Sequence, residues 1–171
     1  MKKPLLLIAS IFLFLTSCSE SKPIKFERDG VSMTSPTGWE ITDQENIDDQ
    51  GYYLSIEKDG FDSSGIVTMT WINGEIDLGE WAYLFQEELV NNIIYRNSNI
   101  QFEDAVDDTY NDIDTSSIRF TASILGLDHE GNIHFFYKGD KTFAILIQEA
   151  TEDNMTNKPG FDLIEKGFKV E

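Results

Sequence analysis

The chain has 171 residues, of which 31 are acidic and 13 basic, giving a formal charge of −18. Such a surface repels phosphate backbones, and no basic stripe with interleaved aromatic residues is present, so nucleic-acid binding is excluded. Cys18 is the single cysteine, which excludes a disulfide framework within the chain.

The first eighteen residues have the composition of an export signal. Two lysines at positions 2–3 precede an uncharged apolar run at positions 5–15. This run is too short to cross a bilayer, which takes about 20 residues. The sequence Leu15-Thr16-Ser17-Cys18 resembles the lipobox of bacterial lipoproteins, which implies cleavage before Cys18 and lipid attachment at its thiol. An ordinary signal peptide with a cysteine near its end is the alternative.

This resemblance divides the chain into a signal peptide at 1–17, a polar tether at 18–25 and a single domain at 26–171. The signal contains two basic residues and no acidic ones, so the remaining 154 residues carry a formal charge of −20. Two or more acyl chains anchor a protein stably, so we expect the membrane to be one partner. Ser19 is not the acidic residue that often retains lipoproteins at the inner membrane. For a Gram-negative source, this implies the outer membrane, facing the periplasm.

Two strands are predicted in the first half of the domain. Residues 52–57 and 67–72 each alternate between apolar and polar side chains, which is typical of half-buried strands. The segment Asp59–Gly65 between them is predicted to be a hairpin loop.

A long helix is predicted from Asp77 to Arg96. Asp77 has the position of an N-cap, and Glu80 follows three residues later, as in a capping box. Apolar residues then recur at helical spacing and predict a stripe that faces the core: Leu78, Trp81, Phe85, Leu89 and Ile93.

Strands and one more helix are predicted in the second half. Residues 118–124, 133–137 and 143–147 read as antiparallel strands separated by turns at Gly131-Asn132 and Gly139-Asp140. The segment 143–147 is apolar on both faces, which favours a central position in the sheet. The closing helix is expected to begin at Pro159 and to end at Gly167.

The two histidines suggest one metal-site hypothesis. If Gly131-Asn132 is a two-residue turn, His129 lies opposite His134 and both could share a metal with Asp128. The alternative is a pair of exposed turn histidines. The sequence otherwise predicts no metal site and no cofactor.

The opening of the domain resembles the PsbP/Mog1/DcrB-like superfamily. The resemblance rests on Phe26, the segment Gly30-Val31-Ser32-Met33 and a P-x-G-W turn within residues 35–41, and on the order of the later elements. It implies an α+β sandwich with an antiparallel sheet of about six to seven strands and two helices. Trp39 is then expected to pack under the sheet; the alternative places it in a ligand groove.

The superfamily is used mostly for binding and has no shared catalytic residues to transfer. We therefore expect a lipid-anchored binding or assembly module of the cell envelope, with an unidentified protein partner and no catalysis of its own. An envelope hydrolase with an unrecognised site is the alternative. Aromatic residues dominate interface energies, and the strand alternation leaves Tyr53 and Phe136 outside the core, so these two are the predicted contact residues. The alternative is that the closing helix covers them or that they are single exposed aromatic residues without a role in binding.

Overall fold

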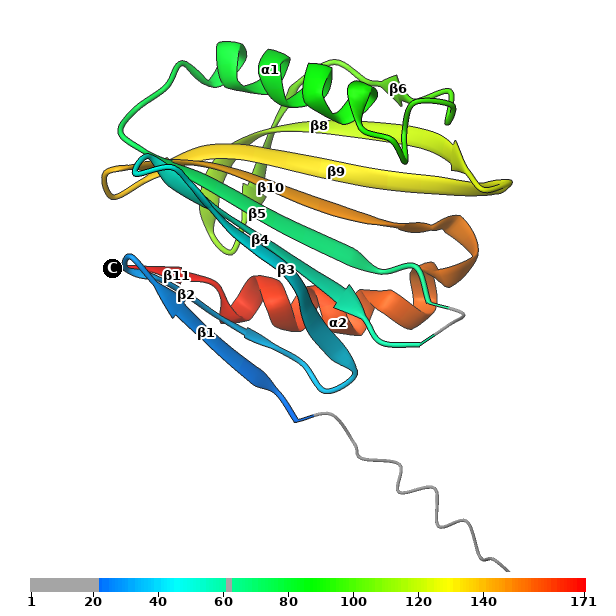
Figure 1. Cartoon of the computed structure of the whole chain (residues 1–171), viewed down its shortest axis with the longest axis horizontal. Helices are drawn as coiled ribbons and strands as arrows, with labels where there is room; N and C mark the ends of the chain where they lie inside the picture. Colours follow the sequence, from blue (N-terminus) through cyan, green and yellow to red (C-terminus); the bar gives the residue numbers. More distant parts are fainter. Residues whose placement is uncertain (1–21, 61–62) are drawn as a thin grey trace, which may run out of the picture.

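The computed structural model describes residues 22–60 and 63–171, and its largest element is an eight-stranded antiparallel sheet (Figure 1). Seven strands follow the order β3-β4-β5-β10-β9-β8-β6, and β7 pairs with β8 beside this path. The bounds are β3 (Trp39–Ile47), β4 (Gly51–Lys58), β5 (Ile66–Asn73), β6 (Gln101–Phe102), β7 (Val106–Tyr110), β8 (Ile113–Ile124), β9 (Leu127–Lys138) and β10 (Lys141–Ala150).

Two further layers cover the faces of this main sheet. One face carries α1 (Leu78–Asn91), and the other carries α2 (Asn154–Gly167) with a small sheet of order β1-β2-β11 (Figure 1). The remaining elements are β1 (Ile24–Arg28), β2 (Val31–Ser35), β11 (Lys169–Val170) and the 3-10 turn η1 (Thr151–Asp153). The predicted α+β class is confirmed. The structure has more strands than predicted because β6, β7 and β11 are too short or too polar to show apolar alternation.

The strand predicted to be central is central. β10 lies between β5 and β9, and nearly all of its residues are buried. Phe143 and Ile145 point into the cluster on the α2 side, whereas Ala144 and Leu146 point into the cluster on the α1 side. An apolar run on both faces therefore indicated a strand with a packed layer on each side.

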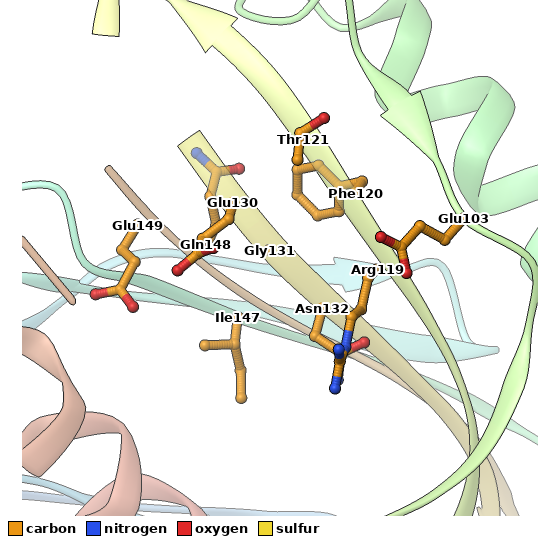
Figure 2. Close-up of a pocket in the computed structure, with 10 residues that line it drawn as sticks. All are labelled: Glu103, Arg119, Phe120, Thr121, Glu130, Gly131, Asn132, Ile147, Gln148 and Glu149. Atoms are coloured by element: carbon orange, nitrogen blue, oxygen red, sulfur yellow. The ribbon is translucent and has the colours of Figure 1, made fainter. Parts of the chain in front are cut away.

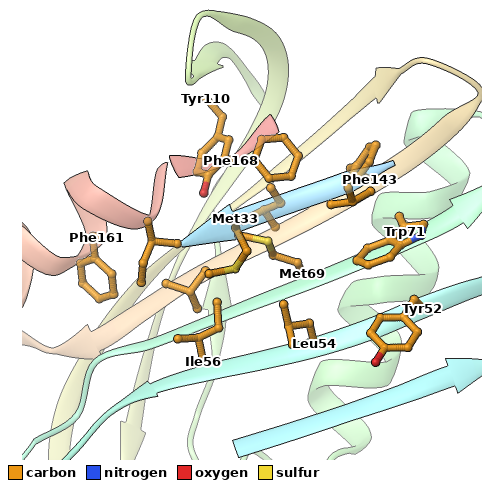
Figure 3. Close-up of a cluster of buried hydrophobic side chains, with 14 of the residues drawn as sticks. Met33, Tyr52, Leu54, Ile56, Met69, Trp71, Tyr110, Phe143, Phe161 and Phe168 are labelled. Atoms are coloured by element: carbon orange, nitrogen blue, oxygen red, sulfur yellow. The ribbon is translucent and has the colours of Figure 1, made fainter. Parts of the chain in front are cut away.

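Aromatic rings fill the α2 side of the core (Figure 3). Phe136 and Phe143 stack with ring centroids 5.1 Å apart, and Phe168 meets both rings edge-on. Trp71 lies 5.1 Å from Tyr52 and is fully buried. Burial of such large side chains supplies about 1.5–3 kcal/mol each, so this cluster holds the small sheet and α2 against the main sheet.

The P-x-G-W segment forms a tight turn that buries its tryptophan. The Trp39 N–H donates to the Pro36 carbonyl at 3.2 Å, and Gly38 has a φ of +81° that favours glycine. The Trp39 ring then packs on α2, 5.2 Å from the Phe161 ring and directly over Gly160. Trp39 is 3% exposed and lines neither cavity described below, so the ligand-groove alternative is wrong.

Both helices are present with shifted bounds. α1 is capped as predicted, because the Asp77 carboxylate accepts from the Glu80 N–H at 3.0 Å. It ends at Asn91 rather than at Arg96, since Asn92 is extended. α2 ends at Gly167 as predicted but starts at Asn154, because η1 leads the chain directly from β10 into the helix. Pro159 therefore lies inside the helix, where it has no N–H for the backbone hydrogen bond of that turn.

The predicted turn at Gly131-Asn132 is wrong. β9 passes straight through it, and the chain reverses instead at Leu125-Gly126, where both residues have positive φ. Gly131 serves a different purpose: a Cβ atom there would lie 2.4 Å from the Phe120 ring. This glycine therefore permits close packing across the β8–β9 pair rather than a change of direction.

Candidate functional site

A groove of about 660 Å³ lies between α1 and the part of the main sheet that α1 leaves open. The apolar face of α1 packs on the side of the sheet that contains β8, β9 and β10. The neighbouring strands β3, β4 and β5 turn polar or half-buried residues to the same side, and these form the floor. The volume is within the range typical of ligand sites.

The strand register defines the floor of the groove. Successive residues of a strand point to opposite faces, so each second residue of β3, β4 and β5 faces α1. The pairing then aligns these residues in cross-strand rows. Two rows lie at the centre: Asp43, Ser55 and Thr68 in one, and Glu45, Tyr53 and Thr70 in the other.

The wall of the groove is aromatic and apolar. Trp81, Phe85 and Leu89 of α1 are half-buried and line it, and Phe85 is anchored edge-on against Phe135 of β9. The indole nitrogen Nε1 of Trp81 is buried and has no hydrogen-bond partner among the described residues. This wall therefore offers apolar and aromatic contact, while the Trp81 N–H is enclosed within the protein.

The rim of the groove is acidic. Asp43, Glu57 and Glu88 come from β3, β4 and α1 and line the groove together with Tyr53. Burial raises the pKa of Tyr53 above its ordinary value, and these three carboxylates raise the pKa further, although a hydrogen bond with Ser55 opposes them. The rim therefore has a negative potential that favours a cation.

The two predicted contact residues have different environments. Tyr53 is half-buried in the groove floor and reachable from solvent. Phe136 is 1% exposed and stacks in the α2-side cluster, so its prediction as an external contact residue is wrong. The reason is that β9, like β10, is buried on both faces over residues 133–136.

The histidine hypothesis is also contradicted. His129 and His134 lie on the same strand rather than opposite each other: His129 pairs with Ala122 and His134 with Ser117. Both are buried, and burial is the main cause that lowers the pKa of each. Asp128 adjoins only His129, so the three residues do not form a shared site.

Each histidine belongs to a local hydrogen-bonding arrangement instead. The Nδ1 of His134 lies 3.1 Å from the Thr115 hydroxyl and 4.0 Å from the Asp108 carboxylate. The Nδ1 of His129 lies 3.3 Å from the Gln148 amide nitrogen. Within the described ranges, no group of three or more His, Cys, Asp or Glu residues is arranged to hold a metal ion.

A second cavity, of about 380 Å³, lies across β8, β9 and β10 (Figure 2). It is on the α2 side, because Ile147 in its lining packs against that cluster. Glu149 is 8% exposed, burial raises its pKa, and its Oε2 atom has no hydrogen-bond partner among the described residues. Arg119 lines the other end of the cavity.

The predicted anchor at Cys18 lies outside the described residues. In the part of the chain that the structure describes, no helix has the length and apolar character needed to cross a bilayer.

Sequence reasoning missed most of the groove residues. Trp81 and Phe85 were assigned only to the helix stripe, and Asp43, Glu57 and Glu88 were not singled out among 31 acidic residues. The outward alternation of residues 53, 55 and 57 was a usable signal for the floor. The rim had no such signal, because it depends on which strand lies beside β4 and on where α1 packs.

Comparisons with known proteins identify a fold. No protein-family model matches the sequence, and no curated protein matches it. The structure is similar to cyanobacterial PsbP (CyanoP) from Synechocystis sp. PCC 6803, with a TM-score of 0.56 and 12% identity over 87% of this chain and 92% of that chain. It is less similar to LpqN, a protein involved in cell envelope biogenesis of Mycobacterium tuberculosis (TM-score 0.46, 12% identity, covering 86% and 88%). The chain thus has a PsbP-like α+β fold.

Proposed function

We propose that this protein is a lipid-anchored binding or assembly module of the bacterial cell envelope that binds a partner protein through the groove beside α1. The observation that carries the proposal is the groove itself, which combines a solvent-reachable tyrosine, an aromatic wall and an acidic rim. Aromatic side chains in a concave surface are the usual anchors of protein interfaces.

The position of the first strand of the domain supports a partner in the aqueous phase rather than in the membrane. β1 begins at Ile24 on the side of the domain opposite α1 (Figure 1). Lipid on Cys18 would be joined to β1 through residues 19–23, which span at most about 20 Å. The groove then faces away from the membrane, toward proteins of the periplasm, and the proposed membrane is the outer one.

The anchor is tested by Cys18→Ser. We expect this variant to lose incorporation of an alkyne fatty acid and to leave the membrane fraction, because serine lacks the thiol that is acylated. Ser21→Ala, outside the lipobox, is the matched control and should keep both properties. Unchanged labelling of Cys18→Ser would contradict the anchor.

The binding surface is tested by crosslinking in intact cells that produce the full chain. A photoreactive aromatic residue at position 53 should trap a discrete partner band. Position 83 is the control, since Tyr83 is 59% exposed on α1, does not line the groove and donates its hydroxyl hydrogen to Glu87. Equal trapping at both positions, or none at position 53, would count against the groove.

An envelope hydrolase is the second candidate, and one observation favours it. Glu149 is a buried carboxyl with a raised pKa at the edge of the second cavity, which is a property of general acids. A hydrolase screen on the purified full chain should then give turnover that Glu149→Gln abolishes. The binding proposal expects no turnover in either protein.

A further inference from the structure

We propose that the segment which the groove binds is a basic amphipathic peptide of the partner protein, with its lysine or arginine side chains at the rim and its apolar side chains against α1. This inference rests on the proposed function and adds the chemistry of the ligand. It follows from the charge distribution of the groove and from the separation of its polar and apolar sides.

The acidic side of the groove has no compensating charge. Asp43 and Glu45 of β3, Glu57 of β4 and Glu88 of α1 line it, and no described residue of the lining is Lys, Arg or His. Asp43, Glu45 and Glu88 are exposed, whereas Glu57 is half-buried and accepts from the Thr42 hydroxyl at 2.7 Å. A cation at this rim therefore gains attraction from several carboxylates and displaces no existing ion pair.

Tyr53 marks the place where such a cation is most favourable. Glu45 of β3 lies directly opposite Tyr53 in the strand pairing and Asp43 lies opposite Ser55, so carboxylates of the neighbouring strand border this part of the floor. A lysine or arginine head above the ring also gains a cation–π contact, which is worth most when it is partly shielded from water.

The opposite side of the groove requires apolar groups. Trp81, Phe85 and Leu89 are half-buried there, and Ile94, just beyond the end of α1, is 59% exposed and continues the apolar surface. A ligand that is only cationic, such as a polyamine, leaves this wall unused.

A second copy of the chain does not fit the same surface. The whole chain has a formal charge of −18, so two copies repel each other at an acidic rim. The groove volume of about 660 Å³ accommodates a few side chains rather than a folded domain. A short segment with a positive charge satisfies both conditions.

The test combines crosslinking at position 53 with neutralisation of the rim. In cells that produce the full chain, Asp43→Asn, Glu57→Gln and Glu88→Gln are introduced together and the crosslink yield is compared with the yield for the unmodified rim. Each partly exposed charge contributes about 0.2–1 kcal/mol to binding, which is a factor of roughly 1.5 to 5 in affinity. For the three charges together we therefore expect the crosslink yield to fall about tenfold. The control neutralises three exposed acidic residues outside the groove: Asp104, Asp107 and Glu152.

The crosslinked peptide is then identified by mass spectrometry. A peptide with at least two basic residues alternating with apolar ones, whose yield falls only in the rim variant, supports the proposal. An acidic or neutral peptide, or a yield that the rim variant leaves unchanged, overturns the ligand chemistry while the binding function stands. A complete absence of crosslinks from position 53 removes the proposed function itself.

Discussion

The two faces of the main sheet differ in how completely they are covered. On the α2 side, α2 and the small sheet close over the strands, and the residues beneath them are almost all fully buried. On the α1 side, one helix covers β8 to β10 and leaves β3 to β5 open as a groove. The α2 side therefore holds the larger buried cluster, with the smaller cavity over β8 to β10 at its edge, and the α1 side retains the larger groove that can bind. The same strands serve both purposes, because β4 alternates between buried Leu54 and half-buried Tyr53.

The largest effect is expected from the closed face. Trp71→Ala should lower the free energy of unfolding by about 3–5 kcal/mol, because the ring is fully buried against Phe143 and Tyr52. Trp81→Ala in the groove wall should cost clearly less, since Trp81 is only half-buried. Denaturant titrations of both variants measure the difference. Equal denaturation midpoints for the two variants would show that the two faces of the sheet contribute equally to stability at these positions.

A smaller effect is expected at Gly131, where β9 passes under Phe120. Gly131→Ala should destabilise the protein by about 1–3 kcal/mol, because the new methyl group meets the Phe120 ring. Gly79→Ala in the first turn of α1 is the milder comparison, because the new methyl group would lie 3.2 Å from the Asp77 carboxylate oxygen and meet no ring. Thermal unfolding checks both. If Gly131→Ala unfolds at the wild-type temperature, close packing between β8 and β9 is not the reason for a glycine at position 131.

The histidines should make stability depend on pH. Burial lowers the pKa of His134 and His129 below the ordinary value of about 6.5, so below that pH the unfolded chain binds more protons than the native one. Their contribution is complete above about pH 6.5 and is lost as the pH falls toward the lowered values.

Melting temperatures at pH 7.5 and 5.5 measure this dependence. His134→Gln on the closed face should reduce the fall in melting temperature between the two pH values, and His129→Gln should do the same at the other end of β9. A pH dependence that both variants leave unchanged would assign it to the carboxyl groups instead.

The smallest effect concerns the rim of the groove. Neutralising Asp43, Glu57 and Glu88 should move the pKa of Tyr53 down toward its ordinary value but not fully, because burial is the larger cause. Tyr83, whose pKa is raised by its hydrogen bond with Glu87, should not respond. NMR titration of labelled tyrosine rings, assigned with Tyr53→Phe, resolves the two. A Tyr53 pKa that does not move would place the three carboxylates too far away to act together on a ligand.

The sequence by itself determined the local features of this domain. Alternation at 52–57, 67–72 and 118–124 predicted which side chains point inward, and Asp77 predicted where α1 begins; the structure confirms both. The doubly apolar run at 143–147 even identified the central strand. These signals are local because side-chain direction in a strand and capping at a helix end depend on residues only a few positions apart.

Only the tertiary structure decided the features that depend on distant pairing. Gly131-Asn132 has the composition of a turn, yet the glycine is required by the Phe120 ring of the neighbouring strand. Because β9 continues through this position, Phe136 is buried. For the same reason His129 and His134 lie along one strand instead of opposite each other. The groove likewise requires β3 beside β4 and α1 displaced toward β9. Strand register and helix placement are set by the packing of segments far apart in the chain, so no local pattern contains them.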